Sequence, residues 1–104
     1  MKIVCVAACT AGIAHTYIAR EKLIKGARAL NHDIKVETQG TIGTENALSA
    51  EDIAAADVVI LATDIKIKGE ERFKDKPVVR VKTDVVIKSP VKFLEKVAGS
   101  LAGA

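Results

Sequence analysis

The chain has 104 residues, of which 49% are hydrophobic, so we expect residues 1–104 to form a single domain around one core. Its net charge of +3 arises from 16 basic and 13 acidic side chains that are interspersed, without the basic block or aromatic-interleaved patch of a nucleic-acid-binding protein. No apolar run approaches the ~20 residues of a membrane span, and the first residues lead into a strand rather than a signal peptide. The sequence therefore predicts a cytoplasmic protein with no membrane span of its own.

The cysteines and histidines do not indicate a disulfide or a metal site. On one strand Cys5 and Cys9 would lie about 13 Å apart, at about 3.3 Å per residue, too far for a disulfide. His15 and His32 fall at opposite ends of a predicted helix, so structural zinc is not expected. Gly12 lacks the other glycines of a dinucleotide fingerprint. We expect no metal and no cofactor.

The first half of the chain predicts a strand, a helix and a second strand. Residues 3–8 form a continuous apolar run, as in a central parallel strand that is covered on both faces. Apolar residues then recur at helical spacing, and Asn31 is the expected stop. This helical stripe comprises Ile13, Tyr17, Leu23, Ile24, Ala27 and Leu30. Residues 34–38 alternate between apolar and polar, which indicates an edge strand, and Gly40 and Gly43 mark a loop.

The second half continues the alternation. Residues 49–52 resemble a capping box that opens a short helix ending at Ala56. Residues 58–62 are a second buried strand, and residues 78–81 are a short strand after Pro77. The last helix is predicted to begin with an N-cap serine and a proline at its first position. These are Ser89 and Pro90, followed by the apolar stripe Val91, Leu94, Ala98 and Leu101.

Strand and helix repeats of this length require right-handed crossovers. We therefore expect an α/β fold, Rossmann-like, with an open four-stranded parallel sheet and helices on both faces; counted along the chain, the strands lie in the order 2-1-3-4. Loops after the carboxyl ends of such strands converge on one ligand site. The residues expected there are Cys9, Gln39, Gly40, Thr63, Asp64, Lys82 and Thr83.

Cys9 occupies the joint between the first strand and the first helix, where a reactive thiol is easiest to make. The free amides of a helix's first turn and the positive end of its dipole favour an anion, whether a thiolate or a phosphate. Gly12 lets the backbone approach a ligand closely. Cys5 lies in mid-strand and is expected to be buried and inert. The predicted phosphate-binding loop comprises Thr10, Ala11, Gly12, Ile13, Ala14, His15 and Thr16.

The loop spacing matches that of cysteine-dependent phosphatases of the low-molecular-weight type, which place five residues between the cysteine and an arginine, followed by serine or threonine. Here His15 stands at the arginine position and Thr16 follows it. Without a bidentate guanidinium the site lacks a major clamp on the phosphoryl transition state. This phosphatase-like phosphate loop therefore favours a longer-lived thiophosphate over fast hydrolysis, as a transfer enzyme requires.

Four further polar residues have two interpretations each. His15 contacts the phosphoryl group or adjusts the ionisation of the thiol, or it is only a polar residue of the helix's first turn. Thr16 is an anion donor or part of the helix start. Asp64 is an acid or base at the site, or it caps a turn. Gln39 donates its amide to the bound group, or it is an ordinary polar residue at a strand end.

Several motifs together resemble the IIB domain of the fructose-specific enzyme II of the bacterial phosphoenolpyruvate:sugar phosphotransferase system (PTS). The similarity spans nearly the whole chain, and the motifs occur in the same order. They are Cys9 with Gly-Ile-Ala-His-Thr at 12–16, Val-Glu-Thr-Gln-Gly at 36–40, Ile-Gly at 42–43, Ala-Glu-Asp-Ile-Ala-Ala-Ala-Asp-Val-Val-Ile-Leu-Ala at 50–62, Glu-Arg-Phe at 71–73 and Pro77. The family usually has Pro-Thr-Gly after the cysteine, whereas this chain has Thr-Ala-Gly at 10–12.

The resemblance implies that Cys9 is phosphorylated. It would accept a phosphoryl group from a phosphohistidine on the IIA partner and pass it to fructose or a fructose-like sugar in the membrane permease IIC. The chain would then be peripheral to the inner membrane through IIC. Two alternatives remain open at this point: a phosphatase that releases free phosphate, and a non-catalytic module that senses the phosphorylation of a partner.

Overall fold

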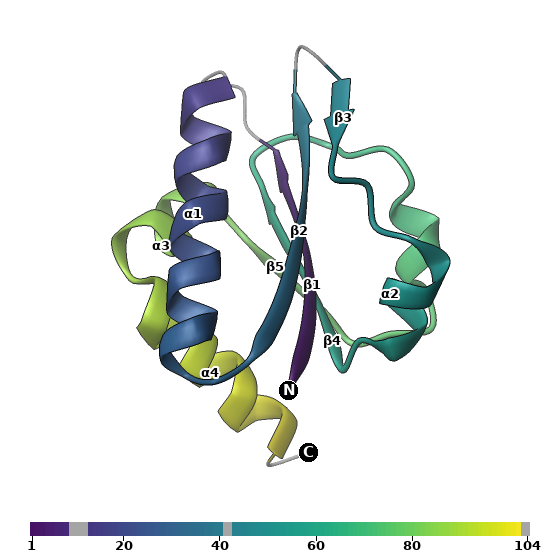
Figure 1. Ribbon diagram of the computed structural model, residues 1–104. Helices are drawn as coiled ribbons and strands as arrows, with labels where there is room; N and C mark the ends of the chain where they lie inside the picture. The colour runs from purple at the N-terminus through teal and green to yellow at the C-terminus, as the bar shows by residue number, and fades with distance from the viewer. Residues whose placement is uncertain (9–12, 41–42, 103–104) are drawn as a thin grey trace.

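The described strands form one open sheet in the order β3-β2-β1-β4-β5 (Figure 1). The structure is a computed structural model that describes residues 1–8, 13–40 and 43–102, and of residues 13–15 and 101–102 the backbone alone. β1 pairs in parallel with β2 and β4, β4 pairs in parallel with β5, and β3 is antiparallel to β2. The strands are β1 (Lys2–Ala8), β2 (Asp33–Gly40), β3 (Gly43–Glu45), β4 (Val58–Thr63) and β5 (Val78–Val81).

The four strands expected from the sequence are present in the expected order, but the sheet has a fifth strand that makes it mixed. The expectation of a wholly parallel sheet is therefore wrong. β3 has only three residues and no apolar pattern, so nothing in its sequence distinguishes it from a loop. It forms a hairpin with the end of β2, pairing Thr38 with Glu45 and Gly40 with Gly43.

The expected helices begin and end close to their predicted positions. α1 (Ile13–Ala29) ends before Asn31, which adopts a left-handed φ of 59°. α2 (Ala50–Ala55) has the predicted capping box, in which Ser49 and Asp52 satisfy each other's backbone N–H groups. α4 is Pro90–Ala102.

Two short helical segments were not expected. They are the 3₁₀ helix η1 (Glu70–Phe73) and the helix α3 (Thr83–Lys88). The β-branched residues 85–87 do not favour a helix, yet α3 packs against α1 and fully buries Val86. Tertiary packing therefore overrides local propensity here. The backbone carbonyl of Ser89 accepts a hydrogen bond from Phe93, so Ser89 both ends α3 and opens α4.

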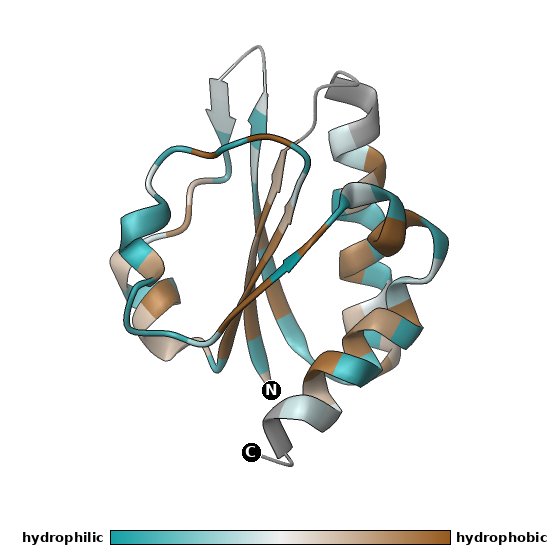
Figure 2. Ribbon diagram, turned by 180° about the vertical axis from the view of Figure 1, so that it is seen from behind, coloured by the Kyte–Doolittle hydropathy of each residue, from teal (hydrophilic) through white to brown (hydrophobic). Residues whose placement is uncertain are grey.

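Helices cover both faces of the sheet: α1, α3 and α4 lie on one face, α2 and η1 on the other (Figure 1). Figure 2 shows hydrophobic residues along the central strands and on parts of the helices. The side chains of β1 alternate between the two layers. Ile3, Cys5 and Ala7 join the cluster under α1, α3 and α4, whereas Val4, Val6 and Ala8 join the cluster under α2 and η1.

A substitution in the hydrophobic cluster under α1, α3 and α4 should destabilise the protein. Leu23 on α1 is fully buried there. We expect Leu23→Ala to lower the free energy of unfolding by about 2 to 5 kcal/mol, because it removes buried methyl groups and leaves a cavity. Urea unfolding at neutral pH measures this change. Lys22→Ala, at the exposed neighbouring position, is the control and should change the free energy of unfolding little; equal effects of both would contradict the assignment of Leu23 to the core.

Candidate active site at the carboxyl edge of the sheet

The carboxyl ends of three parallel strands meet around Ala8. In the register of the sheet Ala8 lies between Gln39 on β2 and Thr63 on β4. The backbone N–H of Asp64 donates to the carbonyl of Ala8 at 3.0 Å. The predicted convergence of the strand ends is therefore present where the chain leaves β1 toward Cys9.

Four residues connect this edge to α1, and they include the candidate nucleophile. Cys9, Thr10, Ala11 and Gly12 lie outside the described residues. Ile13, Ala14 and His15 form the start of α1, but their side chains also lie outside the described part. The roles assigned to these seven residues from the sequence therefore stay predictions. Thr16, the last residue of the predicted loop, is buried in the first turns of α1.

Of the two interpretations of Asp64, the structure shows contacts of the capping kind. One carboxylate oxygen accepts a hydrogen bond from the Thr83 backbone N–H at 3.1 Å, and the other accepts one from the Thr83 hydroxyl at 2.6 Å. Thr83 is fully buried at the start of α3. Asp64 thus joins the end of β4 to α3 through its side chain and to the end of β1 through its backbone. An acid or base role for Asp64 stays a prediction.

Gln39 is held in a network within the chain. Its amide nitrogen donates to the Glu37 carboxylate at 2.8 Å and to the Lys68 carbonyl at 2.9 Å, and its amide oxygen accepts from the Lys68 N–H at 2.9 Å. Both amide hydrogens are therefore engaged, and Gln39 connects β2 to the segment that follows β4. Its predicted contact with a bound phosphoryl group would require one of these hydrogen bonds to break.

Glu37 is the buried centre of that network. It is only 1% exposed, because the segment around Leu48 and η1 cover this face of β2. Arg72 on η1 pairs with both carboxylate oxygens at 2.9 and 3.0 Å, and the backbone N–H of Leu48 donates at 3.0 Å.

The balance of forces on Glu37 favours its charged form. Burial by itself would raise the pKa of the carboxyl, but hydrogen bonds from Arg72, Gln39 and the Leu48 N–H outweigh it, so the pKa lies below its ordinary value. Arg72 is positioned in turn by the Gly69 carbonyl and by the ring of Phe73 beneath its guanidinium. A charged residue between Val36 and Thr38 in a strand was the sequence signal that could have indicated a buried ion pair.

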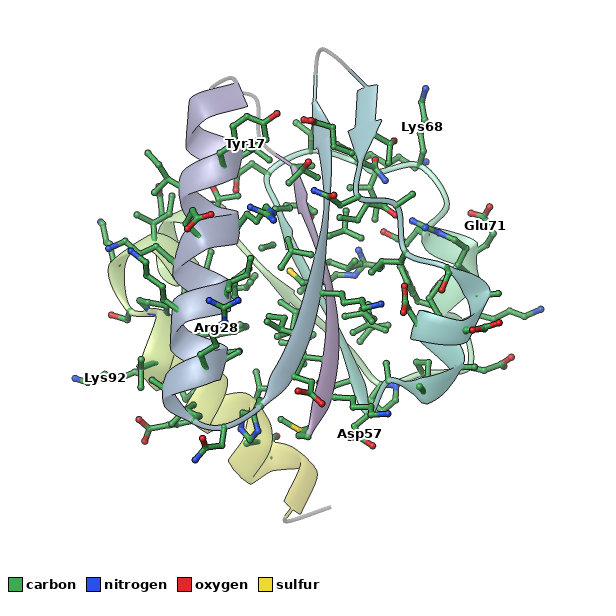
Figure 3. The ribbon with its side chains drawn as sticks, viewed as in Figure 1. Tyr17, Arg28, Asp57, Lys68, Glu71 and Lys92 are labelled. Carbon is green, nitrogen blue, oxygen red and sulfur yellow. The ribbon has the colours of Figure 1, made fainter. Side chains whose placement is uncertain are left out.

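A second link ties α1 to the β2–β3 hairpin. The Tyr17 hydroxyl donates a hydrogen bond to the Glu45 carboxylate on β3. This hydrogen bond raises the pKa of the Tyr17 phenol above its ordinary value, so the phenol remains a donor at neutral pH. Figure 3 shows Tyr17 near the same end of the molecule as Lys68. The hairpin and the start of α1 therefore flank the edge where β1 ends.

Exposed lysines follow the ends of β4 and β5. Lys66 and Lys68 lie in the segment after β4, and Lys82 follows β5. Their positive charges favour an anionic ligand or an acidic partner at this edge. Within residues 1–8, 13–40 and 43–102, no group of three or more His, Cys, Asp and Glu side chains could hold a metal ion.

Cys5 lies in mid-strand on β1, fully buried under α1. Burial raises the pKa of its thiol to about 12, although a hydrogen bond with the backbone of Ala62 opposes the shift. The thiol is therefore protonated at physiological pH and has no nucleophilic role. The expectation that Cys5 is buried is confirmed.

An open, mostly parallel sheet flanked by helices is shared with solved IIB structures. A crystal structure entitled predicted fructose-specific IIB, from Escherichia coli, matches with a TM-score of 0.88 and 40% identity, over 95% of this chain and 88% of that one. The family model described as the lactose/cellobiose-specific IIB subunit of the PTS matches residues 4–96.

Two curated relatives from Escherichia coli strain K12 give the same result. The PTS fructose-like EIIB component 2 is 50% identical over 101 residues, which are 97% of this chain and 95% of that protein. A fructose-like PTS EIIBC component is 57% identical over 72 residues, which are 69% of this chain and 15% of that protein. The chain therefore belongs to the IIB family of the phosphotransferase system, in its fructose-like branch. It is a phosphotransferase component that carries phosphoryl groups. None of the helices in the described residues has the length and apolar character needed to cross a membrane.

The ion pair between Glu37 and Arg72 should make the free energy of unfolding depend on pH. Because the pKa of Glu37 is lowered on folding, its contribution is present above the unfolded pKa of about 4.5 and is lost as the pH falls through the folded value. We expect Glu37→Gln to lower the free energy of unfolding at pH 7 by about 2 to 4 kcal/mol, somewhat less than for a fully buried pair because Arg72 is partly exposed. Urea unfolding at pH 7 and at pH 3 measures the difference, which should shrink at the lower pH.

The matched control is Glu70→Gln, which removes the carboxylate of the exposed Arg80–Glu70 pair. That pair has the same bidentate geometry without the burial, so its loss should change stability little at either pH. Equal effects of the two substitutions would contradict the importance of burying Glu37.

Cys5 should resist thiol reagents in the folded protein. We expect a Cys9→Ser variant, in which Cys5 is the remaining cysteine, to take up no iodoacetamide at pH 8 until urea unfolds it, because the thiol is buried and protonated. Mass spectrometry of the intact chain counts the added groups. Rapid labelling of the native variant would contradict the burial of Cys5.

Proposed function

We propose that Cys9 is the phosphorylated residue of this IIB component and that residues 1–104 act as one IIB domain. The observation that carries the proposal is the position of the loop: it joins Ala8, where the ends of three strands converge, to the first turn of α1. The 17-residue helix α1 directs the positive end of its dipole toward this loop. The amides from Thr10 to Thr16 would then surround the phosphoryl oxygens, and His15 would contact them or adjust the ionisation of the thiol.

The chemistry consists of two in-line transfers. The Cys9 thiolate attacks the phosphorus of a phosphohistidine on IIA, so that an S–P bond forms while the N–P bond breaks and its electron pair returns to the imidazole. A sugar hydroxyl then attacks the same phosphorus, an O–P bond forms, and the thiolate leaves. The hydroxyl proton passes to a base on the permease or to water. Both steps depend on positioning and charge stabilisation, for which a metal ion is not required.

The partners follow from the proposed reaction. IIA is the donor, and the IIC permease presents fructose or a fructose-like sugar as the acceptor. The relative that is named an EIIBC component supports an association with IIC. We place the chain in the cytoplasm, next to the inner membrane through IIC. The exposed lysines after β4 and β5 would attract the anionic phosphoryl donor.

The arrangement of arginines supports a carrier over a phosphatase. His15 stands where the phosphatase loop has an arginine. Arg72 lies on η1, after β4, and Arg80 lies on β5. Each is held by a carboxylate through two hydrogen bonds. Neither guanidinium is left to clamp the transition state of hydrolysis, so a thiophosphate on Cys9 would persist until an acceptor arrives.

Label transfer tests the assignment of Cys9. We expect phosphorylated IIA to transfer labelled phosphate to the wild-type chain and to Cys5→Ala, and Cys9→Ser to accept at least about a hundredfold less, since a hydroxyl is a far weaker nucleophile than a thiolate. Mass spectrometry at alkaline pH maps the modified side chain. Unchanged labelling of Cys9→Ser would refute the proposal, and rapid release of free phosphate by the wild type would indicate a phosphatase instead.

A further inference from the structure

The N-terminal half of β2 has an unpaired outer edge, which lies away from the carboxyl ends of the strands. The Asp33 N–H donates to the Met1 carbonyl, so Asp33 and every second residue after it direct their backbone groups toward β1. Ile34 and Val36 therefore direct theirs away from β1. β3 pairs only with residues 38–40, and no other described strand lies beside Ile34 and Val36.

The chain itself leaves this edge open. After β3 it turns away at Asn46, which has a left-handed φ of 54°. The space along β2 is a hollow of about 970 Å³. One wall is formed by Arg20, Ile24 and Arg28 of α1, and the other by residues 46–48 and the start of α2. A backbone segment placed in this hollow would continue the line of β3.

The α1 wall has a repeating chemistry. Arg20, Ile24 and Arg28 are four residues apart, so they follow each other along the helix at about 6 Å. Side chains on one face of a strand follow each other at about 6.6 Å, nearly the same spacing. A strand beside β2 would thus place three alternate side chains opposite a cation, an apolar residue and a second cation. Figure 3 shows Arg28 on α1 beside β2.

Within the described residues, neither arginine has its charge fully satisfied. The Nε atom of Arg20 is buried and has no hydrogen-bond partner among the described residues, and its head group meets only the exposed Glu21 at 3.2 Å. Arg28 is exposed and forms no ion pair within residues 1–8, 13–40 and 43–102. By contrast, Lys35 of β2 is already paired with Asp52 at the start of α2, at 2.7 Å.

We propose that this edge of β2 binds an extended acidic segment of a partner protein, which adds to the sheet as a strand and places two carboxylates, four residues apart, on Arg20 and Arg28. The segment has the pattern acidic-x-apolar-x-acidic, with its apolar side chain against Ile24. Backbone hydrogen bonds to Ile34 and Val36 hold the strand, and the arginines select its side chains. A second copy of this chain fits less well, because the two-fold register that uses Ile34 and Val36 of both copies is centred on Lys35 and brings that lysine against its own copy. The site does not involve Cys9, so it stands apart from the proposed transfer.

A peptide with fluorescein on its N-terminal amine, fluorescein-Thr-Glu-Thr-Val-Thr-Glu-Thr-amide, tests the proposal with the full chain. Anisotropy gives its Kd, and amide hydrogen exchange by NMR locates it. We expect saturating peptide to slow the exchange of the Ile34 and Val36 N–H groups. The double variant Arg20→Gln/Arg28→Gln should raise the Kd about tenfold, as expected for two partly exposed ion pairs.

Two controls separate this mode of binding from general attraction between opposite charges. Lys22→Gln/Lys25→Gln removes the same charge from exposed positions of α1 outside the hollow and should raise the Kd less than about twofold. A peptide N-methylated along its backbone keeps its carboxylates but cannot pair as a strand, and it should not protect the two amides. Equal weakening by the two double variants, unprotected Ile34 and Val36, no binding at millimolar peptide, or protection of the edge by a dimer of the chain seen in sedimentation would each overturn the proposal.

Discussion

The parallel register of β1 between β2 and β4 determines where the candidate site lies. Because the three strands run in the same direction, Ala8, Gln39 and Thr63 end side by side, and the segment after Ala8 must cross that edge to reach α1. A slip of one residue would exchange the two faces of β1 and turn Cys5 away from the α1 layer. The alternation of side chains between two apolar clusters holds this register, and so the core places the loop that carries Cys9.

The segments around this edge are connected by polar contacts rather than by a further apolar cluster. Gln39 joins β2 to Lys68, Asp64 joins β4 to Thr83, and Tyr17 joins α1 to β3. Each contact connects elements that are distant in sequence. Hydrogen bonds of this kind contribute modestly to stability but fix geometry, because each has a defined direction and length. The rim of the candidate site is therefore built by residues that do not themselves need to touch the phosphoryl group.

The sequence was sufficient for the elements with a strong local signal and insufficient for those made by tertiary contacts. Residues 58–62 are apolar throughout, and Ser49 begins a capping box, so the buried strand and the short helix were both predicted. β3 has three residues without a pattern, and α3 contains β-branched residues that favour a strand until α1 is packed against them. The burial of Glu37 could not be predicted for the same reason. It depends on Arg72, which lies 35 residues further along the chain and cannot be assigned as its partner from spacing alone. Of the candidate site, the sequence predicted the converging strand ends, and only the structure revealed the network that ties Gln39 into the fold.

The two helical layers differ in how they are attached. The layer of α1, α3 and α4 interlocks closely, since a Cβ added at Gly26 would lie 3.1 Å from the Leu94 side chain. The layer of α2 and η1 has a helix of six residues, a 3₁₀ turn of four, and the charged pair between Glu37 and Arg72. Because this layer is shorter and has a charged pair beside its apolar contacts, we expect it to open at a lower free energy than the layer of α1, α3 and α4. In mild denaturant the layer of α2 and η1 would separate from the sheet first and expose the face of β1 and β4 that it covers. The strand ends would stay packed against the helices on the opposite face.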